Sequence, residues 1–370
     1  MDYSALYRAI TTVYSAVPKR LLRGYAFPPL QVFIELTRRC NLRCAMCQNL
    51  LYTERMSADK EKSKELTLDE WKRVIDEMPR LALITFTGGE PLFRADFAEI
   101  LKYTCARRRC HVITNGALLD AELAELMVAS AARSVLLRGL VFLGISVHGP
   151  AEIHDAITQV PGSFAKAAEG AGHLAAIKAR ARSKLPLLYL CTVLTRETVE
   201  TLPEMPGIAK EFSANILNIA LCTTSLDLSI ERGASMETML KYPRPPDPIE
   251  EDLVRDRLSE TARRCSELGI QLRLPRMPIS EIVNHYAGKW HPSDYTCNFA
   301  WSKTSISPYG DVSTCHHFEV GSLREDSLKK IWNGAGYRRF RRASKHRRAF
   351  PICAGCCEIG YSPSKSTPDL

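Results

Sequence analysis

Three cysteines lie close together in the N-terminal part of the chain, within the segment Glu-Leu-Thr-Arg-Arg-Cys-Asn-Leu-Arg-Cys-Ala-Met-Cys at residues 35–47. Cys40, Cys44 and Cys47 follow an apolar run at residues 32–36. Soft thiolates of this kind hold iron–sulfur clusters, and a four-iron cluster needs four ligands to be closed. Because the segment supplies three, one iron would stay open for an outside ligand, as a catalytic metal keeps a vacant position. Zinc is the alternative, although zinc sites more often show paired Cys-x-x-Cys units.

The spacing Cys-x3-Cys-x2-Cys resembles the motif of the radical S-adenosylmethionine (radical SAM) enzymes, which lies in the loop after their first barrel strand. Thr-Gly-Gly-Glu-Pro at residues 87–91 is similar to the family segment that binds the methionine amino group. The resemblance therefore implies that Gly88, Gly89, Glu90 and Pro91 bind the cofactor. Glycines at this place would let the backbone approach the ligand closely, because they have no side chain to block it.

Two further segments extend this resemblance. Residues 111–116, His-Val-Ile-Thr-Asn-Gly, match the third strand of the family and its turn, which implies a cofactor contact for Asn115. Residues 143–150 are similar to the fourth-strand pattern Ser-x-Asp-Gly-Pro, which implies that Ser146 contacts the ribose or the carboxylate of the cofactor. His148 stands where the family usually has Asp, so the sequence departs from the pattern there.

Apolar, strand-like runs alternate with helical stretches over residues 31–235. The expected strands cover residues 32–36, 81–86, 111–114, 141–147, 187–193 and 216–221. The expected helices cover residues 68–78, 97–106, 121–132 and 164–181. Such alternation predicts a parallel sheet with covered faces, hence an α/β fold. Six units fit the family's partial (β/α)6 TIM barrel, whose chemistry lies at the carboxyl ends of the strands, where all the motifs above fall.

Residues 1–30 are predicted to form an amphipathic helix followed by a basic linker. Apolar side chains recur at helical spacing at Tyr3, Leu6, Tyr7, Ile10, Tyr14 and Val17. Such a helix could lie on a membrane surface. The alternative, which we favour, is a helix packed on the wall of the barrel.

Residues 236–290 are interpreted as a connector that begins with a proline-rich turn. A helix is expected over residues 249–268 and a strand over residues 270–274. Cys265 lies on the apolar face of that helix, so we expect it in the core rather than among metal ligands.

A second group of cysteines occupies residues 291–370. Its members are Cys297, Cys315, Cys353, Cys356 and Cys357. The pattern Cys, loop, Gly, four residues, Cys resembles the auxiliary-cluster region of the SPASM and twitch subgroups of radical SAM enzymes. A full SPASM domain needs cysteines for two clusters, and this chain has enough for one. The resemblance thus implies a twitch domain, in which Cys297, Cys315, Cys353 and Cys356 close one auxiliary four-iron cluster that transfers electrons or is structural. Cys357 is the alternative to Cys356.

Among the remaining cysteines, Cys222 ends the sixth expected strand, where a barrel places chemistry. Epimerases of this superfamily quench the substrate radical with a cysteine hydrogen atom, so Cys222 is a hypothetical hydrogen-atom donor. The other unassigned cysteines are interpreted as small buried hydrophobic residues: Cys105, Cys110, Cys191 and Cys265. His316 and His317 adjoin Cys315, and either a base or a structural role is open to them.

The chain has 370 residues, 13 cysteines and a formal net charge of +9. No stretch is apolar enough to span a membrane and no secretory signal precedes the motif, so a cytoplasmic protein with metal-binding cysteines is predicted. Basic residues gather at residues 338–348. They form either a solvated helix face or a docking surface for an acidic electron donor such as flavodoxin or ferredoxin. No nucleic-acid-binding motif accompanies them.

The resemblance implies a radical SAM enzyme with two 4Fe-4S clusters, which reductively cleaves S-adenosylmethionine to a 5′-deoxyadenosyl radical that abstracts hydrogen. The first hypothesis for its substrate is a small hydroxylated metabolite, a sugar or aminocyclitol, with oxidation, dehydration or epimerisation as the outcome. The alternative hypothesis is a peptide maturase that modifies a ribosomally made peptide. A cluster protein without catalysis is disfavoured, because it would not need the segments that bind S-adenosylmethionine.

Overall fold

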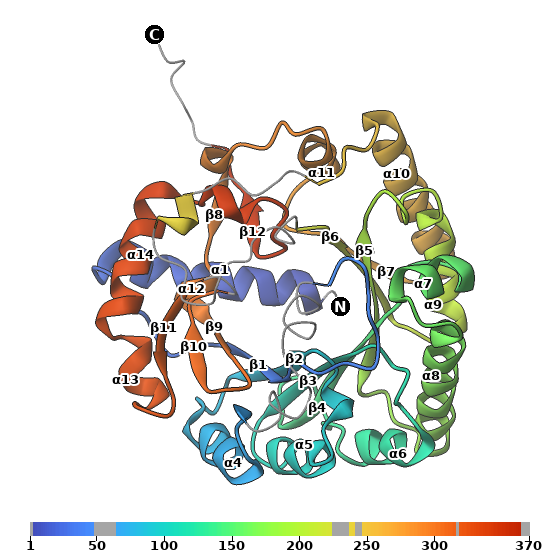
Figure 1. Cartoon of the computed structure of the whole chain (residues 1–370), viewed down its shortest axis with the longest axis horizontal. Helices are drawn as coiled ribbons and strands as arrows, with labels where there is room; N and C mark the ends of the chain where they lie inside the picture. Colours follow the sequence, from blue (N-terminus) through green and yellow to red (C-terminus); the bar gives the residue numbers. More distant parts are fainter. Residues whose placement is uncertain (1–2, 48–63, 224–236, 241–245, 316–317, 364–370) are drawn as a thin grey trace.

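The computed structural model describes residues 3–47, 64–223, 237–240, 246–315 and 318–363. Its main sheet curves around an interior and carries helices on its outer side (Figure 1). The strand order in this sheet is β11-β10-β9-β1-β2-β3-β4-β5-β6-β7. The barrel strands are β1 (Gln31–Thr37), β2 (Leu83–Gly88), β3 (Arg109–Thr114), β4 (Gly139–Ser146), β5 (Leu187–Leu194), β6 (Ile216–Leu221) and β7 (Gln271–Arg273). Consecutive pairs from β1 to β7 are all parallel.

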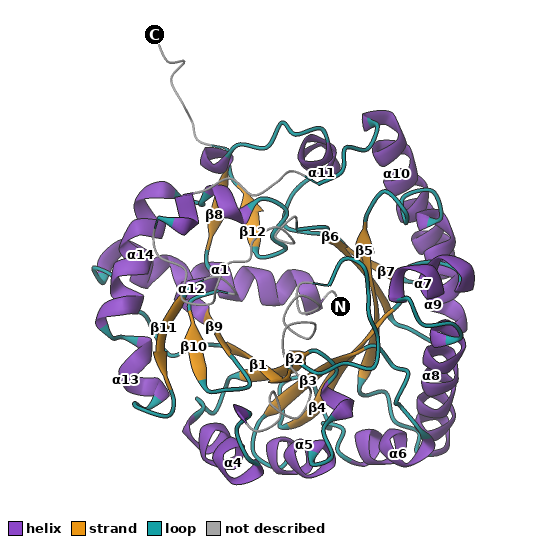
Figure 2. Ribbon diagram, in the orientation of Figure 1, coloured by secondary structure: helices purple, strands orange, loops and turns teal. Residues whose placement is uncertain are grey.

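Helices connect these strands and cover the outside of the sheet (Figure 2). They are α4 (Leu68–Glu77), α5 (Phe97–Cys105), α6 (Ala121–Ala129), α7 (Ala151–Thr158), α8 (Ser163–Arg180), α9 (Met205–Glu211) and α10 (Glu251–Leu268), with short 3-10 helices η1 (Pro91–Phe93), η2 (Leu202–Glu204) and η4 (Thr238–Leu240). The local sequence explains where some of these helices begin and end. Thr67 and Glu70 form a capping box at the start of α4, and Gly269 ends α10 in the left-handed conformation.

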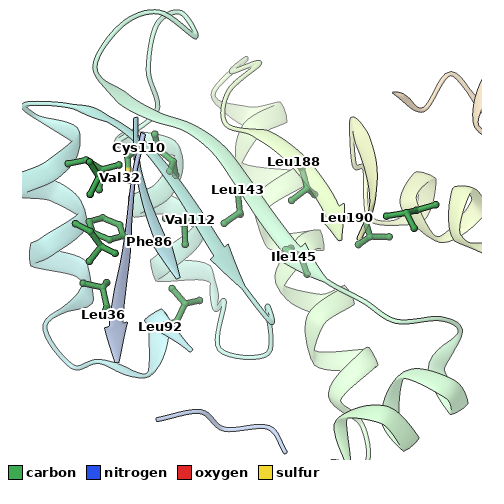
Figure 3. Packing of buried hydrophobic residues seen from close by; sticks show 14 of the residues in the cluster. Val32, Leu36, Phe86, Leu92, Cys110, Val112, Leu143, Ile145, Leu188 and Leu190 are labelled. Carbon is green, nitrogen blue, oxygen red and sulfur yellow. The ribbon is translucent and has the colours of Figure 1, made fainter. Parts of the chain in front are cut away.

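The predicted α/β fold with a partial barrel is confirmed. Alternate residues of each strand point outward into one apolar core, including Phe86, Val112, Leu143 and Leu190 (Figure 3). The second strand begins later than expected, at Leu83, because the preceding Leu81 lies in a turn and is 75% exposed.

The main sheet continues beyond the six predicted strands. Strand β7, from the expected connector, pairs parallel with β6. Strand β9 (Lys303–Ile306), from the C-terminal region, pairs parallel with β1 and continues antiparallel into β10 (Asp311–Ser313) and β11 (Glu319–Ser322). The sheet thus crosses the expected boundaries at residues 235 and 291, and the division into domains stays a prediction.

The remaining elements belong mostly to the C-terminal region. They are α11 (Ile279–Tyr286), η5 (Pro292–Asp294), β8 (Tyr295–Cys297), α12 (Phe299–Ser302), α13 (Leu328–Trp332), α14 (Ala335–Arg347), η6 (Pro351–Cys353) and β12 (Ile359–Tyr361). Strands β8 and β12 form a separate antiparallel pair.

The N-terminal helix α1 (Tyr3–Leu21) packs through a different face from the one expected. Thr11 and Ser15 are buried, whereas Ile10, Val13 and Val17 are exposed. Among the residues that the structure describes, none of the helices combines the length and the apolar character that spanning a membrane requires.

Candidate active site

The loop after β1 brings the first three cysteines together. Cys40, Cys44 and Cys47 are each half-buried, and Leu42 N donates to Cys40 Sγ at 3.4 Å. Burial, together with the neighbouring thiols, raises the pKa of Cys40 to about 11 and that of Cys44 to about 12. Soft sulfur donors with a backbone N–H directed at one of them fit an iron–sulfur cluster, and binding it requires the thiols to lose their protons.

Gly88 and Gly89 are required by the contact between β2 and the cysteine loop. Gly89 N donates to Thr37 O at 2.7 Å. A Cβ added at Gly89 would lie 2.3 Å from Arg39 O, and one added at Gly88 would lie 2.3 Å from Thr37 O. The close approach that the sequence led us to expect for a ligand is therefore made here by the chain's own backbone.

Glu90 joins the ends of β2 and β3 through a buried carboxylate. Its side chain accepts hydrogen bonds from Thr114 Oγ1 at 2.7 Å, Asn115 N at 2.7 Å and Leu92 N at 3.0 Å. Burial raises the pKa of Glu90 to about 7, although these hydrogen bonds oppose the rise. Pro91, which is also buried, starts the short helix η1. Glu90 thus holds the two strand ends together beside the cysteine loop.

Asn115 contacts the cysteine loop directly. Its Nδ2 donates to Asn41 Oδ1 at 2.8 Å and lies 3.7 Å from Cys40 Sγ. Ser146, the last residue of β4, is half-buried and lies one strand beyond. The structure therefore brings Asn115 and Glu90 next to Cys40 and places Ser146 at the neighbouring strand end.

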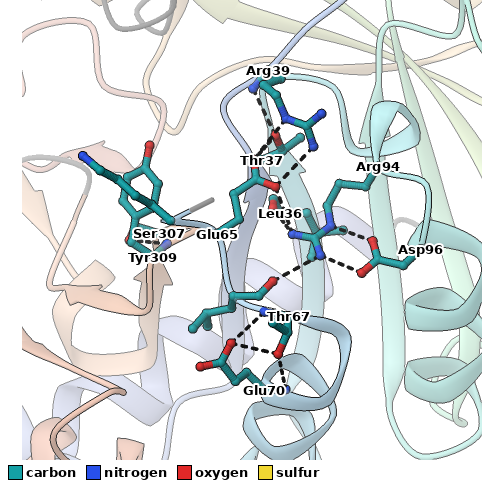
Figure 4. Close-up of polar contacts among 12 residues, drawn as sticks. Leu36, Thr37, Arg39, Glu65, Thr67, Glu70, Arg94, Asp96, Ser307 and Tyr309 are labelled. Carbon is teal, nitrogen blue, oxygen red and sulfur yellow. Dashed lines mark hydrogen bonds and ion pairs between the residues drawn. The ribbon is translucent and has the colours of Figure 1, made fainter. Parts of the chain in front are cut away.

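A buried ion-pair network fixes the start of the cysteine loop (Figure 4). Arg94 Nη1 donates to Leu36 O at 3.0 Å and to Glu65 Oε2 at 3.3 Å, and its other nitrogens bind Asp96 at 2.7 and 2.8 Å. Glu65 also accepts from Thr37 Oγ1 and pairs with Arg39. Sequence reasoning missed this network, because Arg94 and Glu65 are 29 residues apart and belong to no motif.

Helix α7 supports the other side of the cysteine loop. Arg43 N donates to Thr158 O at 3.0 Å, and Ala45 N donates to Ile157 O at 2.9 Å. His148, which replaces the family's Asp, donates through its backbone N to His154 Nδ1 at 3.1 Å. Burial lowers the pKa of His148 to about 3 and that of His154 to about 4, so both imidazoles are neutral at pH 7.

Several of the C-terminal cysteines are near enough for their charges to interact, although no three metal-binding side chains of the described residues form a preformed metal site. The charge of Cys297 acts on both Cys353 and Cys356, and that of Cys315 acts on Cys353. Phe299 N donates to Cys297 Sγ at 3.4 Å. These four thiols fit a cluster by their donor chemistry.

The neighbouring Cys357 is exposed as a residue, but burial of its thiol is the main cause that raises the pKa of this group. The charges that act on the thiol are those of Glu358, Lys303 and Arg273. His316 and His317 lie outside the described residues.

Cys222 lies between the barrel and the loop of C-terminal cysteines. Its N donates to Tyr286 Oη at 3.2 Å, and its carbonyl faces His285 Nε2 at 3.2 Å. A Cβ added at Gly355, between Cys353 and Cys356, would lie 2.8 Å from Cys222 O. The end of β6 therefore packs directly on the C-terminal cysteine loop.

The remaining cysteines divide by their burial. Cys105, Cys110 and Cys265 are buried, as predicted, whereas Cys191 is half-buried.

Two family models match separate parts of the chain. Residues 34–205 match the radical SAM superfamily. Residues 297–357 match the SPASM model, described as an iron–sulfur cluster-binding domain. Each match contains one of the two cysteine groups.

Similar proteins cover most of the chain. A PqqA peptide cyclase of Rhodopseudomonas palustris is 30% identical over 342 residues, which are 88% of this chain and 79% of the relative. A PqqA peptide cyclase of Granulibacter bethesdensis is 29% identical over 83% of this chain and 75% of its own length. Streptococcus suis SuiB bound to precursor peptide SuiA has the same fold, with a TM-score of 0.63, 13% identity and coverage of 95% of this chain and 76% of SuiB.

These comparisons correct the leading hypothesis for the substrate. A sugar or aminocyclitol was expected, and that expectation is wrong, because the relatives that match most of the chain are named as peptide cyclases.

Proposed function

The chain belongs to the radical SAM superfamily, in the subgroup with a SPASM domain, and from this membership we propose that it modifies a peptide by closing a bond between two of its side chains. The observation that carries the proposal is the 30% identity to a PqqA peptide cyclase along 88% of the chain. The alternative hypothesis drawn from the sequence, a peptide maturase, thereby becomes the main one. A peptide is also the partner that the relatives' names support.

The cofactors are 4Fe-4S clusters and S-adenosylmethionine. When bound, they supply the one-electron cleavage that generates a radical able to remove hydrogen from an unactivated carbon. We propose that Cys40, Cys44 and Cys47 hold the first cluster. Asn115 and the N–H of Leu42 then stabilise the sulfur of Cys40, because hydrogen bonds to sulfur set cluster properties.

The proposed binding site for S-adenosylmethionine lies between the ends of β2, β3 and β4. Gly88, Gly89, Glu90 and Pro91 form its β2 side, and Asn115 and Ser146 form its β3 and β4 sides. Glu90 has the charge and position to accept a hydrogen bond from a methionine ammonium group, because binding a cation would favour its ionised form.

We propose one auxiliary cluster, held by Cys297, Cys315, Cys353 and Cys356. The mutual charges of these thiols support the set. Cys356 is favoured as the fourth ligand because the charges of Cys353 and Cys297 act on it, whereas those that act on Cys357 come from Glu358, Lys303 and Arg273. Two four-iron clusters give about eight irons per chain. Replacing Cys40, Cys44 and Cys47 together by Ala should leave about four irons.

Single substitutions distinguish the two candidate fourth ligands. Cys356→Ser should lower the iron content, whereas Cys357→Ser should keep it. The reverse pattern would assign Cys357 as the ligand.

The auxiliary cluster is proposed to receive an electron, because closing a bond between two C–H carbons removes two hydrogens in total. Docking of an acidic electron donor, such as flavodoxin or ferredoxin, and a cytoplasmic location stay predictions from the sequence. Cys222, half-buried at the end of β6, stays a proposed hydrogen-atom donor for an epimerised peptide only, because a hydrogen atom returned to the substrate radical would prevent the loss of two hydrogens that a crosslink requires. If Cys222→Ala forms the same product as wild type, Cys222 is not a hydrogen-atom donor in the mechanism.

The function is tested with the reconstituted enzyme under anaerobic conditions. The protein is mixed with S-adenosylmethionine, a reductant and a synthetic copy of a short peptide encoded beside its gene, and the peptide is analysed by mass spectrometry. We expect a product lighter by two hydrogens, with one internal crosslink, that the triple-Ala variant does not form. Cleavage of S-adenosylmethionine with no change in any such peptide would overturn the proposal.

A further inference from the structure

Four polar side chains form a row across the inner face of the barrel. Strand register pairs Ser146 of β4 with Cys191 of β5, Cys191 with Asn218 of β6, and Asn218 with Arg273 of β7. In a parallel sheet, paired residues of neighbouring strands point to the same face. The row therefore runs from the proposed site of S-adenosylmethionine to the last barrel strand.

The row faces the interior and is accessible there. The residues next to it in the strands, Ile145, Leu190 and Leu217, point outward and are completely buried. All four members of the row are half-buried. The guanidinium carbon of Arg273 lies 5.9 Å from the ring centroid of Tyr189, which precedes Cys191 by two residues on the same face.

The two members farthest from Ser146 have polar groups that the protein does not use. Within the described residues, the side chains of Asn218 and Arg273 make no hydrogen bond or ion pair. The positive charge of Arg273 helps to lower the pKa of the acidic residue Glu358. Its carboxylate is already bound by Lys303 Nζ at 2.7 and 2.8 Å. Among the residues that the structure describes, Arg273 therefore has no carboxylate paired with it, and its positive charge is available to a ligand in the interior.

The position of Arg273 separates it from the cofactor. Neighbouring strands lie about 4.8 Å apart, so three spacings along the curved sheet place the backbone of Arg273 at most about 14 Å from that of Ser146. The C-terminal cysteine loop lies near this end of the row, because the charge of Arg273 also acts on Cys357. A group bound at Arg273 would lie between the cofactor site and the C-terminal cysteines, where a substrate must lie.

We propose that Arg273, assisted by Asn218, binds a carboxylate of the peptide substrate inside the barrel. A guanidinium binds a carboxylate through two parallel hydrogen bonds, and the amide of Asn218 can donate a third. The carboxylate comes from an Asp or Glu side chain or from the peptide C-terminus. This inference rests on the proposed peptide substrate and specifies which group of it the barrel recognises.

The test measures binding of a fluorescein-labelled copy of the peptide that the enzyme modifies. Arg273→Gln should weaken binding at least tenfold, because a charge-assisted bidentate contact is lost, and Arg273→Lys should restore part of it. Arg263→Gln, an exposed substitution on α10 with the same change of net charge, should leave the affinity within twofold of wild type. Equal losses in Arg273→Gln and Arg263→Gln would mean general charge attraction and would overturn the proposal.

Peptide variants identify the carboxylate. Each Asp or Glu is changed to its amide, and one peptide carries a C-terminal amide. One of these peptides should bind wild type at least tenfold more weakly and show no further loss with Arg273→Gln. If every amide variant binds wild type normally, the proposal fails.

Cleavage of S-adenosylmethionine without peptide distinguishes a failure of the inference about Arg273 from a failure of the proposed peptide function. Its rate and the KM for S-adenosylmethionine should be the same in wild type and Arg273→Gln. A raised KM would mean that Arg273 binds the carboxylate of the cofactor, which overturns the inference but leaves the peptide function standing. If no peptide is modified by wild type, the proposed function itself fails.

Discussion

The guanidinium carbon of Arg38 lies 4.7 Å from the ring centroid of Tyr309. Arg38 precedes Cys40 by two residues, and Tyr309 lies in the turn between β9 and β10. The same turn binds the segment before α4, since Leu66 N donates to Pro308 O at 2.7 Å. The C-terminal region therefore touches the loop that carries the first cysteine group, and the two cysteine regions are mechanically connected.

Replacing Tyr309 by Leu should weaken this connection. A cation–π contact with a desolvated guanidinium contributes about 2 kcal/mol, and Arg38 is only 5% exposed. We expect the free energy of unfolding in urea to be lower for Tyr309→Leu than for Tyr309→Phe by about that amount, because Phe keeps the ring. If Leu and Phe give the same free energy of unfolding, the aromatic face does not contribute.

Gly89→Ala should displace the cysteine loop. The new Cβ would meet Arg39 O at 2.3 Å and Arg38 O at 2.5 Å, so the backbone must move. We expect the chain to lose the irons held by the first cysteine group, measured as iron per chain after reconstitution.

Gly172→Ala is the matched control for this substitution. Gly172 lies in α8 and has no atom within 4 Å of the added Cβ. Its iron content should not change, and its unfolding free energy should rise by about 0.5–1 kcal/mol, the helix preference for Ala. Normal iron content in Gly89→Ala would contradict the tight contact.

Arg94→Met should strongly destabilise the protein. The substitution leaves Glu65 and two backbone carbonyls without their buried partner, and breaking a buried ion pair costs about 3–5 kcal/mol. Arg180→Met serves as the control, because its ion pair with Glu125 is exposed and contributes less than about 1 kcal/mol. The free energy of unfolding of both variants is measured in urea. Similar decreases would show that the buried ion pairs stabilise the protein no more than the exposed one.

His154 should make the protein less stable in mild acid. Its pKa is lowered to about 4 by burial, while the unfolded chain takes up a proton near pH 6.5. Below pH 6.5 the unfolded state binds more protons, so stability falls as the pH decreases towards 4, at up to about 1.4 kcal/mol per pH unit. His154→Phe should reduce this slope between pH 6.5 and 5.0 in urea unfolding, and an unchanged slope would exclude the contribution.

Local patterns predicted the parts of this protein that depend on near neighbours. The spacing of Cys40, Cys44 and Cys47 predicts a cluster loop, because eight consecutive residues keep their own thiols near one another. Alternation of apolar runs predicted the partial barrel, because each strand needs one buried face. The capping box at Thr67 and the stop at Gly269 are equally local.

Only the tertiary structure decided which distant residues meet. Sequence spacing carries no information on the contact of Arg94 with Glu65, of Arg38 with Tyr309, or on the strand β9 that pairs with β1. The substrate was mispredicted for the same physical reason. Substrate choice depends on side chains that separate strands place on one inner face, as we propose for Arg273, and no local motif records that arrangement.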